Sequence, residues 1–320
     1  MARRRWLIEQ RMAALLSKLR RMFTTFSRRM ATSRRTLAGS SGLTITGLSS
    51  TLRSLDALTD NFRDHTGDPS TFPSSTDLIV GPGFTDRFGP GKGYPTVEDS
   101  SIHESAYKDR NLREIDFEIE GKGLTIGQFR AFDFYGDGSF YLIDSPGHAT
   151  GHMCGLARTL ADPPQFIIMG GDIAHHGGEF RPTEYLPLPS NIQPSPLVEP
   201  YARISPVCPG AIFEAIHPKK SSTEPYMRPE GEIHDNAKQV LESINHWQEF
   251  DAQDNVFAVI AHDESLKDVL EFYPKPANDW RKKSWKEQGR WRFLRDFDTS
   301  KEKGTGLSAD QSDEVLEAQS

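Results

Sequence analysis

The sequence is poor in cysteine and has no long apolar run. Only two of its 320 residues are cysteines, Cys154 and Cys208, so a disulfide framework is not expected and cysteine alone cannot build a zinc site. No stretch of about 18 apolar residues occurs, so no membrane-spanning helix is predicted. Hydrophobic residues make up 36% and charged residues 26% of the chain, which is enough for one large domain or two small ones with a buried core.

Acidic residues are almost absent from the first 55 positions. Residues 1–55 hold 12 Lys/Arg and one acid, Glu9, whereas the rest of the chain holds 26 basic and 44 acidic side chains. This asymmetry indicates that residues 1–55 are a different kind of segment. Apolar residues recur with helical spacing over 6–26, with arginines on the remaining face. Such an Arg-rich, Ser-containing and acid-poor amphipathic start is typical of an organellar transit peptide; a disordered basic arm and a wrongly translated exon are the alternatives. We expect a cytoplasmic protein, or a mitochondrial one if the segment is a transit peptide.

Three segments are expected: the basic segment 1–55, a folded domain over 56–300 and a polar, disordered tail over 301–320. Residues 180–230, which are rich in Pro and Ser, are expected to form one long surface loop.

Hydrophobic patterning predicts the elements of the folded domain. Helical periodicity predicts a long helix over 233–250 and a short one over 266–272. Apolar or alternating runs predict strands at 77–80, 129–135, 139–143, 153–159, 165–169 and 255–261. Hairpins with helices between and after them indicate an α+β or layered αββα domain.

Four short motifs rich in His, Asp and Gly stand out. They span Asp64–Asp68, Ser145–His152, Gly170–Asp172 and Ala261–Asp263. Three of the four follow directly from predicted strands, so His148, Asp172 and His262 are expected at one end of a sheet. Imidazole and carboxylate together suit Zn²⁺ or a similar divalent ion. A single His beside Gly is more often an ordinary loop residue, but four such motifs in this order favour a metal site.

The order of these motifs resembles the metallo-β-lactamase superfamily, closest to its lactonase-like branch and fungal members, over about residues 58–297. The resemblance implies a four-layer αββα sandwich with one or two bound Zn²⁺ ions. It also implies a hydrolase in which a metal-bound hydroxide opens a lactone, lactam, ester or thioester. The expected partner is a small molecule with a hydrolysable carbonyl, and the oligomeric state stays open.

The resemblance also implies a set of metal ligands. Asp64 and His65 match the last two positions of the family motif H-x-H-x-D-H, and with His262 they would bind the second metal. Asp172 matches the carboxylate that bridges both metals, and His148 matches a ligand of the first. The same resemblance makes Asp64 a candidate catalytic residue.

His175 lies three residues after Asp172, where some lactonases of the family carry a Tyr that polarises the substrate carbonyl. A His there is able to donate a hydrogen bond to an oxyanion or to act as a general acid, so His175 is the second candidate catalytic residue. The alternative is a solvent-facing His. His152 matches the family's second, non-ligating His, and His176 is expected to be a bystander.

The chain departs from the family at the first two metal-binding histidines. These positions fall on Asp60 and Phe62, and a Phe cannot bind a metal. The first metal then keeps only His148 and Asp172, fewer than the three or four ligands usual for zinc. We expect the N-terminal half of the sandwich to be incomplete, and the alternative function is a catalytically impaired or inactive remnant of the fold.

A nucleic-acid binder that uses the basic segment is the weakest alternative. Beyond residue 55 the net charge is −18, which repels phosphates, so no nucleic acid is expected as a partner. Substrate specificity is expected in the loops 84–112 and 180–230. Their aromatic residues either line a pocket or pack against the domain: Phe84, Phe88, Tyr94, Tyr185 and Tyr201.

Overall fold

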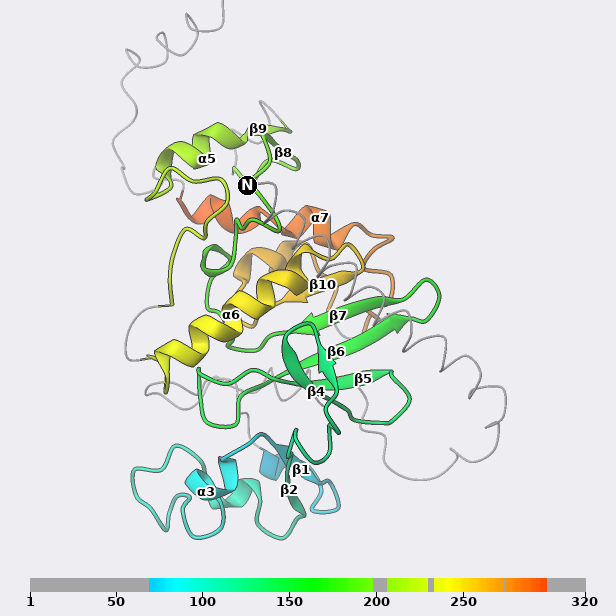
Figure 1. Cartoon of the computed structure of the whole chain (residues 1–320). Helices are drawn as coiled ribbons and strands as arrows, with labels where there is room; N and C mark the ends of the chain where they lie inside the picture. Colours follow the sequence, from blue (N-terminus) through cyan, green and yellow to red (C-terminus); the bar gives the residue numbers. More distant parts are fainter. Residues whose placement is uncertain (1–68, 198–205, 230–232, 273, 298–320) are drawn as a thin grey trace, which may run out of the picture.

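A computed structural model describes residues 69–197, 206–229, 233–272 and 274–297 (Figure 1). The segment 1–55, the tail 301–320 and the Asp60–His65 stretch lie outside the described residues. The division of the chain into three segments therefore stays a prediction.

One six-stranded sheet forms the centre of the molecule, in the order β10-β7-β6-β5-β4-β3. Strands β3 to β7 are antiparallel in succession, and β10 joins β7 in parallel. The strands are β3 (Thr125–Ile126), β4 (Phe129–Asp133), β5 (Phe140–Asp144), β6 (Met153–Leu160), β7 (Gln165–Met169) and β10 (Val256–Val259). The expected α+β fold is found, and its sheet is curled (Figure 1), whereas the four-layer arrangement and the incomplete N-terminal half stay predictions.

Helix α6 (Ala237–Ala252) covers one face of this sheet (Figure 1). Its apolar residues recur at intervals of three and four, so Val240, Ile244 and Trp247 lie on one side of the helix and are buried. They pack with sheet residues such as Ile143 into the largest core cluster. The helix was expected from residue 233, but it begins later because the Asn236 side chain accepts a hydrogen bond from the first turn.

The opposite face of the sheet carries a second apolar cluster. Alternate residues of β5 divide between the two faces: Ile143 packs under α6, while Leu142 packs against Ile115 and Phe117. All five residues of β5 are buried, as expected for a strand covered on both faces.

A small unit precedes the sheet and lies at one end of it (Figure 1). Strand β1 (Leu78–Val80) pairs in parallel with β2 (Leu112–Glu114), and the short helix α3 (Phe84–Phe88) lies between them in the sequence. Phe88 and Tyr107 are buried in the core of this unit, so these two aromatic residues pack inside it.

The prediction of one long loop over 180–230 was wrong. Strand β8 (Asn191–Ile192) pairs with β9 (Cys208–Pro209), and helix α5 (Gly210–Ile216) follows. These pieces bury apolar side chains against the C-terminal segment, which their short length conceals in the sequence. Within the described ranges the chain also forms five short 3-10 helices: η1 (Pro69–Thr71), η2 (Glu104–Ala106), η3 (Gly177–Glu179), η5 (Glu264–Asp268) and η6 (Arg292–Phe297).

Helix α7 (Trp285–Gly289) is anchored by a buried lysine. The Lys286 ammonium donates hydrogen bonds to the carbonyls of Asp251, Gln253 and Val256, where α6 ends and β10 begins. Three donors thus meet three acceptors, and the positive charge lies beside the carboxyl end of a helix. Burial lowers the pKa of Lys286 to about 7.

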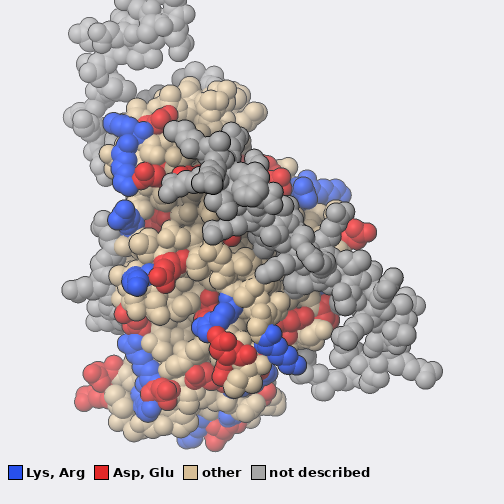
Figure 2. Space-filling view, viewed as in Figure 1, with Lys and Arg blue, Asp and Glu red and all other residues tan. Residues whose placement is uncertain are grey.

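Within the described residues, no helix has the length and apolar character needed to span a lipid bilayer. On the face shown in Figure 2, acidic side chains lie among the basic ones rather than in separate fields.

Candidate metal-binding and catalytic site

Three strands deliver polar residues to one edge of the sheet. Since β5 and β7 are both antiparallel to β6, and β10 is parallel to β7, all three strands end at the same edge. His148 follows β5, Asp172 follows β7 and His262 follows β10. The structure brings the three side chains together: His148 Nε2 lies 3.4 Å from Asp172 Oδ2, and His262 Nε2 lies 3.6 Å from Asp172 Oδ1.

A divalent cation fits the chemistry of these pairs. His148 and Asp172 are buried, with 4% and 5% of their surfaces exposed. The Nε2 atom of His148 is itself buried and makes no hydrogen bond within the described part of the chain, although a carboxylate faces it. In a tetrahedral zinc site with metal–ligand distances of about 2.0–2.1 Å, two ligand atoms lie about 3.3 Å apart. The two distances from a histidine Nε2 to an Asp172 oxygen, 3.4 and 3.6 Å, are close to this value.

These residues are an incomplete ligand set. Among the described residues, no group of three or more His, Cys, Asp or Glu side chains is arranged to hold a metal ion by itself. The two remaining ligands that the family resemblance implies, Asp64 and His65, lie outside the described residues. A complete site therefore requires residues beyond those that the structure describes.

Gly147 allows the His148 loop to approach helix α6. Its φ is +127°, and a Cβ at this position would lie 2.2 Å from the backbone nitrogen of Val240. No other residue type combines that backbone conformation with that contact. The loop is thereby held against the first turn of α6, which sets the position of His148.

His152 supports Asp172 through the backbone. Its Nδ1 donates to the Ser145 carbonyl at 2.8 Å, and its Nε2 accepts a hydrogen bond from the Asp172 backbone N–H at 3.2 Å. Both ring nitrogens are therefore occupied, in agreement with the non-ligating role expected from the sequence. Burial lowers the pKa of His152, which keeps the ring neutral and able to accept that bond.

His175 lies within the cluster of histidines. Its ring stacks on His262 with centroids 4.7 Å apart and lies 5.0 Å from the ring of His148. Burial, aided by the neighbouring histidines, lowers the pKa of His175 to about 4. At neutral pH the ring is therefore uncharged and has one N–H to donate.

Sequence reasoning missed Glu179, which lies on η3 beside His175. Its Oε1 accepts a hydrogen bond from the His175 backbone N–H at 3.3 Å, whereas its buried Oε2 has no partner among the described residues. Burial raises the pKa of Glu179 to about 7. No local pattern marks such a residue, because its burial comes from packing.

Sequence reasoning also missed His234, which it placed inside the helix predicted over 233–250. The residue lies before α6, and its Nδ1 is 3.2 Å from Nδ1 of His148. Burial lowers its pKa. Asn236 is a typical N-cap residue, and a helix that begins after it leaves His234 in the preceding loop.

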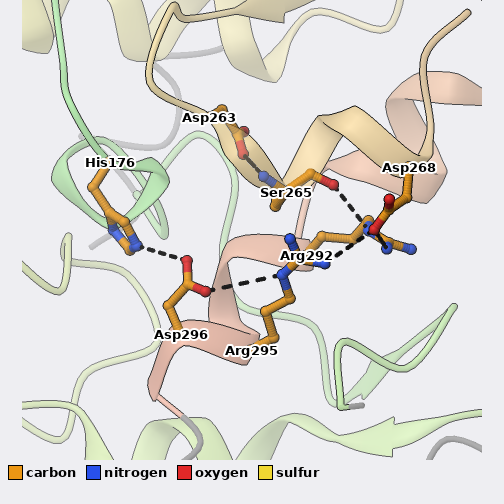
Figure 3. A network of polar contacts seen from close by, with 7 residues as sticks. All are labelled: His176, Asp263, Ser265, Asp268, Arg292, Arg295 and Asp296. Atoms are coloured by element: carbon orange, nitrogen blue, oxygen red, sulfur yellow. Dashed lines mark hydrogen bonds and ion pairs between the residues drawn. The ribbon is translucent and has the colours of Figure 1, made fainter. Parts of the chain in front are cut away.

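The C-terminal segment braces two loops at the rim of the site (Figure 3). His176, next to His175, contacts η6: its Nε2 lies 3.3 Å from a carboxylate oxygen of Asp296. On the other side, Arg292 of η6 donates to the Ser265 carbonyl. The loops that follow β7 and β10 are thus both tied to η6.

Several proteins similar to this chain carry hydrolase names. The gamma-lactamase FDB1 of Fusarium pseudograminearum is 52% identical over 236 residues, 73% of this chain and 55% of that protein. The gamma-lactamase MBL2 of Gibberella moniliformis is 55% identical over 184 residues, 57% of this chain and 74% of that protein. The metallo-hydrolase mfmC of Annulohypoxylon moriforme is 44% identical over 241 residues, 74% of this chain and 60% of that protein.

These similarities and the four ordered motifs show the family. The chain belongs to the metallo-β-lactamase superfamily of hydrolases. It spans a little over half the length of the first of these relatives, 55%. No family model matches the chain, and no solved structure matches it.

Proposed function

We propose that this chain acts as a metal-dependent hydrolase that opens a small cyclic amide or ester, with a γ-lactam as the first substrate to test. The observation that carries the proposal is the meeting of His148, Asp172 and His262 at one sheet edge. The names of two relatives more than 50% identical to the chain support the choice of a γ-lactam. Lactones, other lactams, esters and thioesters share the attacked carbonyl and form the rest of the test panel.

We assign His148, Asp172 and His262 as ligands of one divalent cation, preferably zinc, together with Asp64 and His65. A bound cation of this kind makes a water molecule acidic and polarises the substrate carbonyl. The buried Asp172 carboxylate supplies the negative charge that balances the cation, and the His152 ring holds the backbone from which it projects.

His175 is assigned as the donor to the oxyanion. Because burial holds its pKa near 4, a charged imidazolium is not available at neutral pH, and hydrogen-bond donation is favoured over general acid catalysis. In the reaction, the water oxygen bonds to the carbonyl carbon, the C–N bond of the lactam breaks, and the leaving nitrogen takes up a proton from the attacking water. Asp64 is retained as the candidate that carries this proton.

A second candidate is an impaired member of the family that binds metal too weakly to act. Two observations favour it: Phe62 stands at a family His position, and no complete metal-binding group occurs within the described part of the chain. The two candidates differ in metal stoichiometry.

The test measures bound metal and γ-lactam turnover with the full chain supplied with zinc. The first candidate predicts about one equivalent of zinc and turnover, both lost in Asp172→Asn and strongly reduced in His262→Ala. A matched control is His103→Ala, an exposed histidine in the small unit near β1 and β2. Less than a few tenths of an equivalent in the parent chain, with no turnover, would favour the impaired protein.

A further inference from the structure

His234 contacts the side of the His148 ring that faces away from Asp172. The two Nδ1 atoms lie 3.2 Å apart, whereas Nε2 of His148 lies 3.4 Å from Asp172 Oδ2. The two nitrogens of the His148 ring therefore have different neighbours, one an imidazole and the other a carboxylate. Which nitrogen carries the proton decides what His148 is able to bind.

The contact between two ring nitrogens constrains the proton. A neutral imidazole has one N–H and one lone pair, so the hydrogen bond needs the N–H on one ring and the lone pair on the other. If His148 has its proton on Nε2, that N–H should donate to Asp172. The Nε2 atom makes no such hydrogen bond, even though the carboxylate is 3.4 Å away. The geometry instead fits a proton on Nδ1 of His148, donated to Nδ1 of His234; the proton of His234 then lies on its buried Nε2, which has no partner among the described residues.

His234 is held in place by its neighbours rather than by the contact with His148 alone. The backbone N–H groups of Asp235 and Asn236 donate to the carbonyls of His148 and Gly147, each at 2.9 Å. The Asp235 carboxylate accepts a hydrogen bond from the Thr150 backbone N–H at 2.7 Å and also pairs with Arg87. Hydrogen bonds on both sides of His148 thus join it to the residues that follow His234, about 86 positions further along the chain.

We propose that His234 fixes His148 in the tautomer with its proton on Nδ1, so that the Nε2 lone pair is offered to a divalent cation beside Asp172. The inference rests on the proposed function, since it concerns the same metal site. His234 is a positioning residue: it contacts a ligand and not the reacting atoms. Partners of metal-binding histidines typically change metal affinity by 10- to 100-fold when they are removed.

The variants separate the hydrogen bond from the packing. His234→Leu removes the acceptor but fills similar space, whereas His234→Asn keeps a carbonyl oxygen that is able to accept the Nδ1 proton. The matched control is His246→Leu, a partly buried histidine on α6 that packs against Phe129. Circular dichroism checks that all variants are folded.

Two readouts test the inference. Titration with zinc against a coloured chelator should give a 10- to 100-fold weaker affinity for His234→Leu, partial recovery for His234→Asn and no change for His246→Leu. In the metal-free parent chain at pH 8, the nitrogen-15 shifts of His148 should report a proton on Nδ1, and His234→Leu should give a mixture of tautomers.

A proton on Nε2 of His148 in the metal-free parent would overturn the inference, as would an unchanged zinc affinity in His234→Leu. The tautomer measurement needs no bound metal, so it still decides the role of His234 if the parent chain fails to bind zinc. Failure of the parent chain to bind zinc would count against the proposed function and not against the role of His234.

Discussion

Replacing Glu179 by glutamine tests whether the buried carboxyl beside His175 is protonated in the folded protein. Burial raises its pKa from 4.5 to about 7, and only one of its oxygens accepts a hydrogen bond from the described residues. A shift of this size corresponds to about 3 kcal/mol, at about 1.4 kcal/mol for each pKa unit. Because the folded pKa lies above the unfolded one, this contribution is fully present below pH 4.5 and is lost as the pH rises through about 7.

Glutamine cannot ionise, so the Glu179→Gln variant does not lose this contribution to the free energy of unfolding as the pH rises. Its amide N–H₂ lacks an acceptor at the position of Oε2, which should destabilise the variant by about 1–3 kcal/mol at pH 4.5. Between pH 4.5 and 7.5 the free energy of unfolding of the variant should then rise by about 3 kcal/mol relative to the parent chain.

The assay is urea unfolding of chelator-treated protein at several pH values across this range. Metal is removed because a nearby cation would favour the ionised carboxylate. The control is Glu242→Gln on the exposed side of α6, which should show no comparable change with pH. A difference between Glu179→Gln and the parent that stays constant across this range would show that Glu179 is ionised in the fold, and the reasoning from burial would be wrong.

Three further changes test the fold and the site. Asp251→Asn should lower the free energy of unfolding by about 3–5 kcal/mol, because it leaves the buried Arg181 guanidinium, now 2.5 Å from the carboxylate, without its counter-charge. The control Glu264→Gln, in an exposed ion pair, should leave the free energy of unfolding nearly unchanged in the same urea assay. Gly147→Ala should weaken zinc affinity in the chelator titration, since its Cβ would clash with the Val240 backbone; an unchanged affinity would show that the loop relaxes without moving the site. Zinc at about 100 times its dissociation constant should raise the free energy of unfolding by about 2.7 kcal/mol, and the absence of any rise in the melting temperature would contradict metal binding.

The elements with strong periodicity could be predicted from the sequence. The strand expected at 165–169 has those bounds as β7, and the helix expected over 233–250 is found as α6 (Ala237–Ala252). The short strands β8 and β9 could not be predicted, because two residues carry no measurable period and their pairing is decided by distant partners.

The candidate site divides in the same way. His148, Asp172 and His262 could be singled out because each follows an apolar strand, and strands that run in the same direction end at the same edge of a sheet. Glu179 and His234 have no such local marker. Their importance comes from burial and from a ring-to-ring contact across the fold.

The sequence by itself determined the chemistry at the sheet edge, since the types of residue and their positions after strands are properties of the chain order. Only the tertiary structure decided the state of each group. Burial holds His175 uncharged and raises the pKa of Glu179, and the crossing of the loop before α6 gives His148 a neighbour on its second nitrogen. Solvent exclusion and contacts between distant segments depend on packing in three dimensions, and a linear pattern does not contain them.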